Sequence, residues 1–230
     1  MVAKLELRDV WFRYSKEEDY VLRGVDLDLR ESELVVVVGP NGSGKTTLIL
    51  LAAGLLRPER GEVLLEGKPL HKQLPLARRK IGVTFQDPDD QFFNATVYDE
   101  IAFALRQLKV SEDEVRTRVT EIARMLSIEH LLNKLPYKLS GGEKVKVALA
   151  SILVYEPEIL LLDEPTAYLT PENKDEVIEI LRKLKESGRS ILIATNDSDI
   201  IKHTTSKVLK IVNGKLFTVK QSPNDRREPE

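Results

Sequence analysis

The sequence contains no cysteine, and this absence excludes several kinds of chemistry. Thiol nucleophiles, cysteine-ligated zinc and iron–sulfur clusters all need cysteine sulfur. No apolar run approaches the roughly 20 residues that a membrane-spanning helix needs. The first residues also lack the apolar core of a secretory signal. We therefore expect a soluble, cytoplasmic chain that folds without disulfides.

A strong excess of one charge is absent as well. Lysine and arginine total 35 against 37 aspartate and glutamate residues, a formal net charge of −2. Proteins that hold nucleic acid electrostatically usually show a basic bias, so we expect no nucleic-acid partner. At about 100–200 residues per domain, this length fits one large domain or a core with an inserted subdomain.

Apolar runs bounded by turn residues alternate with segments of helical period. This pattern is typical of a mostly parallel sheet covered by helices. Residues 34–38 are β-branched after the first, which predicts a strand buried on both faces. Similar strands are expected at 159–162 and 190–194, and helices at 45–55 and 171–187. These segments predict an α/β core.

Other segments predict antiparallel strands beside this core. Apolar and polar residues alternate within the first 30 residues and again at 62–65. Asn213 and Gly214 separate two short apolar segments, 208–212 and 215–219, which is a strong hairpin signal. Residues 221–230 are polar and contain proline, so we expect a flexible C-terminal tail.

The middle of the chain lacks a strand pattern. Residues 96–108 and 111–126 predict two amphipathic helices, each opened by a hydroxyl residue with an acidic residue three positions later. We interpret 88–138 as a helical subdomain inserted in the core. The core would then comprise residues 1–87 and 139–220.

Residues 39–46 match the phosphate-loop pattern G-x-x-x-x-G-K-[ST] and stand between a predicted strand and a predicted helix. Glycines let successive N–H groups point at an anion, and the helix start adds its positive dipole end. Lys45 would reach the β- and γ-phosphates, and the Thr46 hydroxyl would bind Mg²⁺. The alternative, a glycine-rich turn with an incidental Lys-Thr, is rare by residue frequency. The expected nucleotide-binding residues are Gly39, Asn41, Gly42, Ser43, Gly44, Lys45, Thr46 and Thr47. The expected fold class is an α/β P-loop NTPase core with an antiparallel β flank and an inserted α-helical subdomain.

Asp163 and Glu164 directly follow the second buried strand. A Mg²⁺-nucleotide site needs a carboxylate at the end of a neighbouring strand, so Asp163 is the predicted metal ligand. Glu164 would lie one residue closer to the γ-phosphate and polarise the attacking water. A strand ending in Asp-Glu-Pro is ordinary turn chemistry when it stands alone. Beside a phosphate loop, the metal site is the favoured interpretation.

Residues 139–143, Leu-Ser-Gly-Gly-Glu, stand shortly before this strand and its acidic pair. With that arrangement the chain resembles the nucleotide-binding subunits of ABC transporters. Tyr14 matches the family's adenine-stacking aromatic residue, and Gln86 matches the glutamine that links the catalytic core to the helical subdomain. Residues 85–91, with the Thr-Val and Ile-Ala-Phe sequences that follow, look most like the energy-coupling-factor (cobalt/vitamin) branch. The resemblance extends over roughly residues 2–219.

The resemblance implies a dimer. Ser140, Gly141 and Gly142 open a helix that, in the family, closes on the γ-phosphate held by the opposite subunit; the plainer alternative is that Ser140 only caps the helix. The cofactors implied are ATP and Mg²⁺. The partners implied are a second ATPase subunit, identical or a sister chain, and an integral membrane transporter subunit, which would place this chain on the inner face of the cell membrane. Phe92 and Phe93 would lie by the groove that accepts a helix of the membrane subunit, or else in the subdomain core.

The resemblance also implies roles for single residues. The catalytic residues would be Glu164, Gln86 and Asn196. The nucleotide would contact Tyr14, the phosphate loop and residues 140–142 of the neighbour, and the metal would contact Thr46, Gln86 and Asp163.

Two positions depart from the family pattern. Thr170 stands where members usually carry Asp, and Asn196 stands where they usually carry a His that contacts the γ-phosphate and the attacking water. By analogy with deleting one transition-state donor, the second change would slow turnover by about 10²–10³-fold. One explanation is a heterodimer in which a sister ATPase supplies the missing groups, and the other is a slow homodimer. A soluble ABC ATPase without a membrane partner and a structural, ATP-gated subunit are the remaining alternatives.

Overall fold

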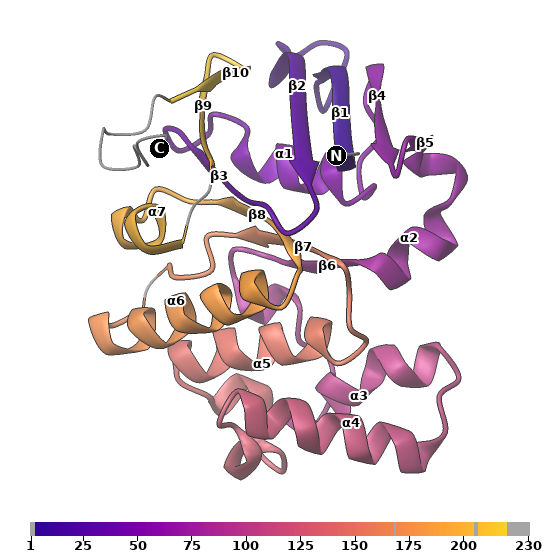
Figure 1. Cartoon of the computed structure of the whole chain (residues 1–230), viewed down its shortest axis with the longest axis vertical. Helices are drawn as coiled ribbons and strands as arrows, with labels where there is room; N and C mark the ends of the chain where they lie inside the picture. The colour runs from indigo at the N-terminus through magenta and orange to yellow at the C-terminus, as the bar shows by residue number, and fades with distance from the viewer. Residues whose placement is uncertain (1–2, 168, 205–206, 220–230) are drawn as a thin grey trace, which may run out of the picture.

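The computed structural model describes residues 3–167, 169–204 and 207–219. These residues form two β-sheets with one helix between them and further helices on the outer face of the larger sheet (Figure 1). The tail predicted at 221–230 lies outside the described residues. Within the described part of the chain, no helix combines the length and the apolar character needed to cross a membrane.

The larger sheet has the strand order β10-β9-β3-β8-β7-β6. Strands β9, β3, β8, β7 and β6 run parallel, and β10 pairs antiparallel with β9. This sheet and its connecting helices establish the predicted α/β class. The strands are β3 (Leu34–Val38), β6 (Ile81–Thr84), β7 (Ile159–Asp163), β8 (Ser190–Ala194), β9 (Lys207–Val212) and β10 (Lys215–Thr218).

The smaller sheet is antiparallel throughout, with the order β2-β1-β4-β5. Its strands are β1 (Ala3–Phe12), β2 (Leu22–Arg30), β4 (Arg60–Leu65) and β5 (Lys68–Pro69). Alternate residues of β1 and β2 face inward, as in Leu5 and Leu7 opposite Leu29 and Leu27. This period-2 burial confirms the predicted antiparallel flank.

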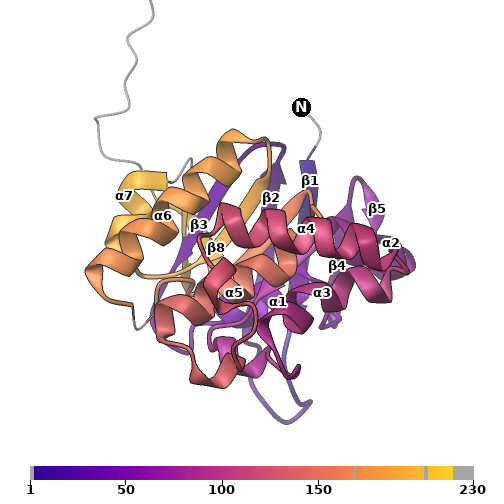
Figure 2. The same ribbon diagram turned by 90° about the horizontal axis from the view of Figure 1, so that it is seen from below.

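The helices are distributed over three levels. Helix α1 lies between the two sheets, α5 and α6 cover the outer face of the larger sheet, and α3 and α4 lie beyond α5 (Figures 1 and 2). Their bounds are α1 Lys45–Ala52, α2 Leu74–Lys80, α3 Val97–Gln107, α4 Glu112–Met125, α5 Gly141–Leu153, α6 Pro171–Glu186 and α7 Ser198–Thr204, with single 3₁₀ turns η1 Leu70–Lys72, η2 Pro88–Asp90, η3 Glu129–Leu131 and η4 Pro136–Lys138.

Strand β3 has apolar residues on both faces because it separates two hydrophobic cores. Leu34 and Val36 join the core beneath α3 to α6, and Val35 and Val37 join the core that contains α1 and the antiparallel sheet. All four are fully buried. Full burial of such a side chain contributes about 1.5–3 kcal/mol, so this strand is fixed firmly at the centre of the sheet. It is the strand from which the phosphate loop departs.

The cap predictions for the middle helices are confirmed. The Thr96 hydroxyl accepts a hydrogen bond from the Asp99 N–H at the start of α3, and the Ser111 hydroxyl does the same for Glu114 at the start of α4. The helix predicted at 45–55 is shorter, because α1 ends at Ala52 and Gly54 adopts a positive φ of 70°.

The sheet order corrects one expectation. Strand β8 lies between β3 and β7, so the strand that carries Asp163 does not neighbour the strand that precedes the phosphate loop. The carboxyl ends of these parallel strands still meet at one edge of the sheet, and the end of β8 therefore also contributes side chains there.

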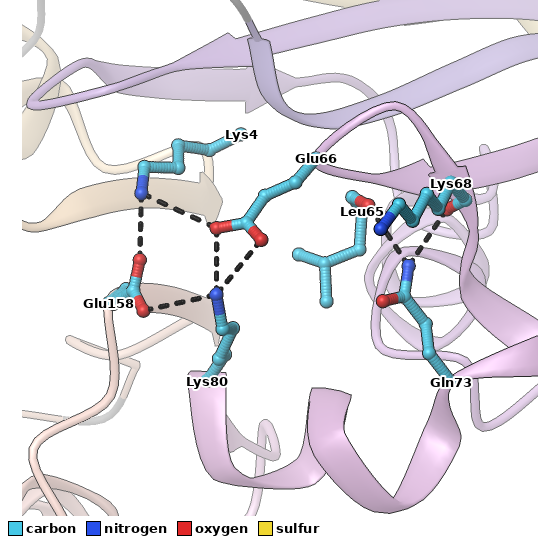
Figure 3. Close-up of polar contacts among 7 residues, drawn as sticks. All are labelled: Lys4, Leu65, Glu66, Lys68, Gln73, Lys80 and Glu158. Carbon is cyan, nitrogen blue, oxygen red and sulfur yellow. Dashed lines mark hydrogen bonds and ion pairs between the residues drawn. The ribbon is translucent and has the colours of Figure 1, made fainter.

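A cluster of four charged residues joins the two sheets at the opposite edge (Figure 3). Lys4 of β1 and Lys80 of α2 each lie within ion-pair distance of both Glu66 and Glu158, at 2.7–3.5 Å. Hydrogen bonds with the two lysines hold the pKa values of both carboxyls below their usual range. We refer to Lys4, Glu66, Lys80 and Glu158 as the charge cluster.

Candidate nucleotide-binding site

The loop between β3 and α1 has the geometry of a phosphate site. Gly44 has a φ of 102°, a conformation that strains other residues, and it immediately precedes the first residue of α1. Gly39 is packed so closely that a Cβ there would lie 2.5 Å from Ile211 Cγ2. The Lys45 side chain is only 7% exposed, and its Nζ donates a 2.9 Å hydrogen bond to the Gly39 carbonyl. An ammonium group is thus held inside the loop.

Asp163, at the end of β7, is 2% exposed. Its Oδ1 is buried and has no hydrogen-bond partner among the described residues. Burial raises the pKa of Asp163, and the nearby Glu164 charge adds to the rise, while a hydrogen bond with Thr46 and the Lys45 charge oppose it. Leaving a buried carboxylate oxygen unpaired is costly unless a cation satisfies it. Asp163 and Thr46 therefore fit a divalent metal.

The fit is to a metal that keeps other ligands. No group of three or more acidic, histidine or cysteine side chains able to hold a metal is present in the described part of the chain. Mg²⁺ is commonly bound by one or two protein oxygens together with substrate phosphates and water. The donor set suits Mg²⁺ only when phosphate oxygens complete it.

Glu164 follows Asp163 in a strained conformation. Its φ is 45°, which is uncommon for a residue with a Cβ, and its N–H donates to the Ala194 carbonyl at 2.8 Å. One carboxylate oxygen accepts a 2.8 Å hydrogen bond from the Thr195 hydroxyl, and the other lies 3.7 Å from Lys45 Nζ. Backbone strain of this kind is concentrated at functional sites, where surrounding contacts hold it in place.

Tyr14 projects from the loop after β1 and is 58% exposed. Its hydroxyl lies 3.0 Å from the Thr47 hydroxyl, and its ring meets Phe12 edge to face at 5.0 Å. These contacts fix the ring while leaving much of it open to solvent. An exposed aromatic face held in place is suited to stacking on a base.

These groups line one open cavity of about 420 Å³. Its lining residues are Tyr14, Val21, Asn41, Gly42, Gly44, Lys45, Thr46, Thr47, Gln86, Asp163 and Glu164. The structure thus brings together most residues predicted to hold base, phosphates and metal. Gly39 and Ser43 belong to the same loop but do not line the cavity, and the Ser43 hydroxyl is buried without a partner among the described residues.

The residues predicted to serve a second chain lie apart from this cavity. Ser140 caps α5, and its N–H and hydroxyl both donate to the Glu143 carboxylate at 2.8 Å. These bonds hold the pKa of Glu143 below its usual range. The lining of this cavity, among the described residues, does not include Ser140, Gly141 or Gly142.

Thr195 and Asp197, on either side of the predicted Asn196 after β8, form a part of the site that sequence reasoning missed. Thr195 bonds Glu164, and its hydroxyl also accepts from the Asp197 N–H at 3.0 Å. Asp197 in turn accepts from Thr166 and from Lys174 of α6. The available signal was that Thr195 and Asp197 follow a buried parallel strand, just as Asp163 and Glu164 do.

A glycine-rich loop at a helix start, a buried lysine and an unpaired carboxylate beside it define a P-loop nucleotide-binding protein. The model of the family described as ABC transporter matches residues 22–167, more than half of the chain. The chain therefore belongs to the ABC transporter family of ATP-binding proteins, as the signature at residues 139–143 indicated.

Two relatives within this family bear the name of the energy-coupling-factor branch. The energy-coupling factor transporter ATP-binding protein EcfA of Methanocaldococcus jannaschii is 40% identical over 216 residues, which cover 93% of this chain and 77% of that protein. The protein of the same name from Methanothermobacter thermautotrophicus is also 40% identical over 216 residues, covering 93% of this chain and 69% of that protein.

Solved structures share the fold. CbiO1 of Clostridium perfringens, part of the ABC transporter complex CbiONQ, has a TM-score of 0.84 at 35% identity, covering 94% of this chain and 88% of that one. The ATP-binding cassette MJ0796, in a dimeric post-hydrolysis state bound to ADP and phosphate, has a TM-score of 0.84 at 27% identity, covering 95% of this chain and 100% of that one. The predicted fold class is therefore confirmed.

Proposed function

We propose that this chain is the ATP-hydrolysing subunit of a membrane importer of the energy-coupling-factor type, which works as a dimer closing on Mg²⁺-ATP. One observation carries the proposal. A buried Asp163 oxygen without a hydrogen-bond partner in the described part of the chain, the strained Glu164 and the Lys45 ammonium belong to the same cavity as the exposed ring of Tyr14. These four groups suit, in that order, the metal, the attacking water, the phosphates and the base of one bound nucleotide.

The nucleotide would be held by the residues that line the cavity. The N–H groups from Gly42 to Thr47 and the dipole of α1 attract the phosphates, and Tyr14 stacks on the base. Lys45 exchanges its bond with the Gly39 carbonyl for the β- and γ-phosphates. Mg²⁺, held by Thr46, Asp163 and Gln86, would neutralise the charge that develops between these phosphates.

Glu164 would act as the general base. A water attacks the γ-phosphorus, its proton passes to the Glu164 carboxylate, and the bond to the β-phosphate oxygen breaks to give ADP and phosphate. The Thr195 hydrogen bond occupies one carboxylate oxygen, which leaves the other to accept the proton. A positioned base of this kind contributes about 10²–10⁴-fold to a rate.

The signature residues would complete the site of a partner. Ser140, Gly141 and Gly142 stand at the N-terminus of the 13-residue helix α5, whose N–H groups and dipole favour an anion. Their place outside the cavity of their own chain supports a role toward a second one. Thr170 and Asn196 would make turnover slow, since neither supplies the carboxylate or imidazole of the usual pattern.

Measurements of ATP hydrolysis can show whether the second chain is identical to this one or a sister ATPase. Phosphate release by the purified chain alone, compared with the chain plus a sister ATPase, distinguishes the two dimers. We favour the heterodimer, and full activity of the chain alone would remove that argument. Absence of Mg²⁺-dependent hydrolysis under both conditions, even in a single turnover, would refute the enzymatic proposal.

A membrane subunit would dock beside residues 85–91, which we call the Gln86 segment. Phe93 is 66% exposed and meets Phe103 of α3 edge to face at 4.6 Å. The buried Glu100 carboxylate accepts from the N–H groups of Phe93 and Asn94, at 3.1 and 2.9 Å, and so holds this aromatic pair outward. Exposed aromatic residues fixed in this way are suitable anchors for a partner.

The same segment contacts the signature helix. Asp89 pairs with Lys144, and the Gln91 amide donates to the Ser151 hydroxyl at 2.8 Å. Lys144 and Ser151 both belong to α5. A displacement of the Gln86 segment by the membrane partner would therefore reach the signature residues through two side-chain contacts.

Co-purification tests this surface. We expect Phe93→Ser to reduce recovery of the chain with membranes from cells expressing the whole transporter, while ATP binding is unchanged. Met125→Ser is the matched control, because Met125 is also 66% exposed but lies on α4. Recovery of both variants at the wild-type level would favour a soluble ABC ATPase instead.

We also propose how the chain is divided into domains and where it lies in the cell. Residues 88–138 would form a helical subdomain inserted in the core of 1–87 and 139–220. The assembled chain would lie on the inner face of the cell membrane.

A further inference from the structure

The side chain of Asn196 pairs with both peptide groups of Gly39. Its Oδ1 accepts from the Gly39 N–H at 3.0 Å, and its Nδ2 donates to the Gly39 carbonyl at 2.9 Å. A carboxamide presents one acceptor and one donor side by side, which matches the peptide groups of a single extended residue. Both hydrogen-bonding ends of Asn196 are therefore engaged by the first residue of the phosphate loop.

This contact extends the sheet beyond its last backbone pair. Val37 of β3 is opposite Ala194 of β8, and the Thr195 N–H donates to the Val37 carbonyl at 3.0 Å. Two residues further along each chain lie Gly39 and Asn196. The Asn196 side chain thus supplies the next pair of hydrogen bonds where β3 turns into the loop.

The Gly39 carbonyl has a second donor, Lys45 Nζ, at 2.9 Å. When Lys45 turns to phosphate, that carbonyl loses one of its two bonds. Gly39 is buried, and its flank is closed by Ile211. Without Asn196, the carbonyl would lose its remaining protein donor when Lys45 moves, which opposes that movement.

Asn196 itself does not line the nucleotide cavity. We infer that Asn196 is a positioning residue for the proposed nucleotide site, acting through Gly39: it fixes the start of the phosphate loop and frees Lys45 for phosphate, and it makes no contact with the γ-phosphate. The inference rests on the proposed function, because it concerns the same loop.

The comparison of ADP with ATP tests it. A contact with the γ-phosphate affects only ATP, whereas the loop and Lys45 also hold the β-phosphate that ADP retains. We expect Asn196→Ala to raise the dissociation constants of Mg²⁺-ADP and of a nonhydrolysable Mg²⁺-ATP analogue by about the same factor. That factor is roughly tenfold, the effect of losing the one hydrogen bond that the Gly39 carbonyl would otherwise keep when Lys45 moves. Asn133→Ala, at an exposed position outside the site, should change neither.

Amide hydrogen exchange measures the hydrogen bond between the Gly39 N–H and Asn196 directly. In the protein without nucleotide, the Gly39 amide should exchange faster in Asn196→Ala than in the wild type or Asn133→Ala. Should the alanine variant be unstable, Asn196→Asp keeps the acceptor and is expected to leave this amide slow.

Weakened binding of the ATP analogue alone, or unchanged binding of both nucleotides, would overturn the inference. An unchanged Gly39 exchange rate in Asn196→Ala would do so too. A wild-type chain that binds neither nucleotide would instead refute the proposed function.

Discussion

Replacing Glu164 by glutamine separates nucleotide binding from hydrolysis. The amide keeps the size of the carboxylate and retains an oxygen to accept the 2.8 Å bond from Thr195, so the fold around it should be unchanged. It cannot accept the proton of the attacking water. We expect the hydrolysis rate to fall by about 10²–10⁴-fold, or about 2.7–5.4 kcal/mol in activation free energy.

Binding should survive for electrostatic reasons. The Glu164 charge helps to raise the pKa of Asp163, so removing it makes the metal-binding carboxylate easier to ionise. It also releases Lys45 from an opposite charge 3.7 Å away. The affinity for Mg²⁺-ATP should therefore equal or exceed that of the wild type.

The assay pairs a fluorescent-ATP titration with single-turnover phosphate release. Glu186→Gln, an exposed exchange on α6, is the control for the chemical change alone. Wild-type turnover in Glu164→Gln would refute the assignment of the base. Loss of ATP binding in that variant would refute the electrostatic reasoning.

Variants of Lys45, Asp163 and the charge cluster test three other contacts. Lys45→Ala should weaken ATP binding by about 10–150-fold, the value of a charged hydrogen bond of about 1.5–3 kcal/mol, and an unchanged titration would contradict its role. Because the pKa of Asp163 is raised, ionising this carboxyl costs stability as the pH rises from 3.8, the ordinary pKa, through the raised pKa. Asp163→Asn should therefore raise Tm at pH 7 and remove Mg²⁺-dependent ATP binding. A lowered Tm would count against this reasoning. Glu66→Gln breaks two ion pairs of the charge cluster and should lower the free energy of unfolding by about 1 kcal/mol, and by less in 1 M salt. The control Glu62→Gln should leave the free energy of unfolding unchanged. A loss that salt does not reduce would contradict the ionic explanation.

Much of this architecture is visible in local sequence. The all-apolar run of β3 predicts burial on both faces, and the two sheet faces do contribute to two cores. The glycines and Lys45 of the loop predict a phosphate site, because few other local conformations require that pattern. The hydroxyl caps of α3 and α4 could also be predicted from local sequence, because each cap accepts a hydrogen bond from an N–H group only three residues away.

Features that depend on contacts distant in sequence were not predicted. Nothing local states that β8 lies between β3 and β7, since neighbours in a parallel sheet are joined through long crossovers. Strand β6 was missed because it is short and contains Gly82. The pairing of Asn196 with Gly39 depends on the β3–β8 register, so only the fold reveals it.

We place ATP and its metal at the loop between β3 and α1. A crystal structure of the chain with Mg²⁺ and a nonhydrolysable ATP analogue tests it most directly. We expect the triphosphate to lie against the N–H groups that begin α1, with the metal beside Thr46 and Asp163 and the base on Tyr14. A structure in which saturating analogue leaves that loop empty, or binds elsewhere on the chain, would contradict it.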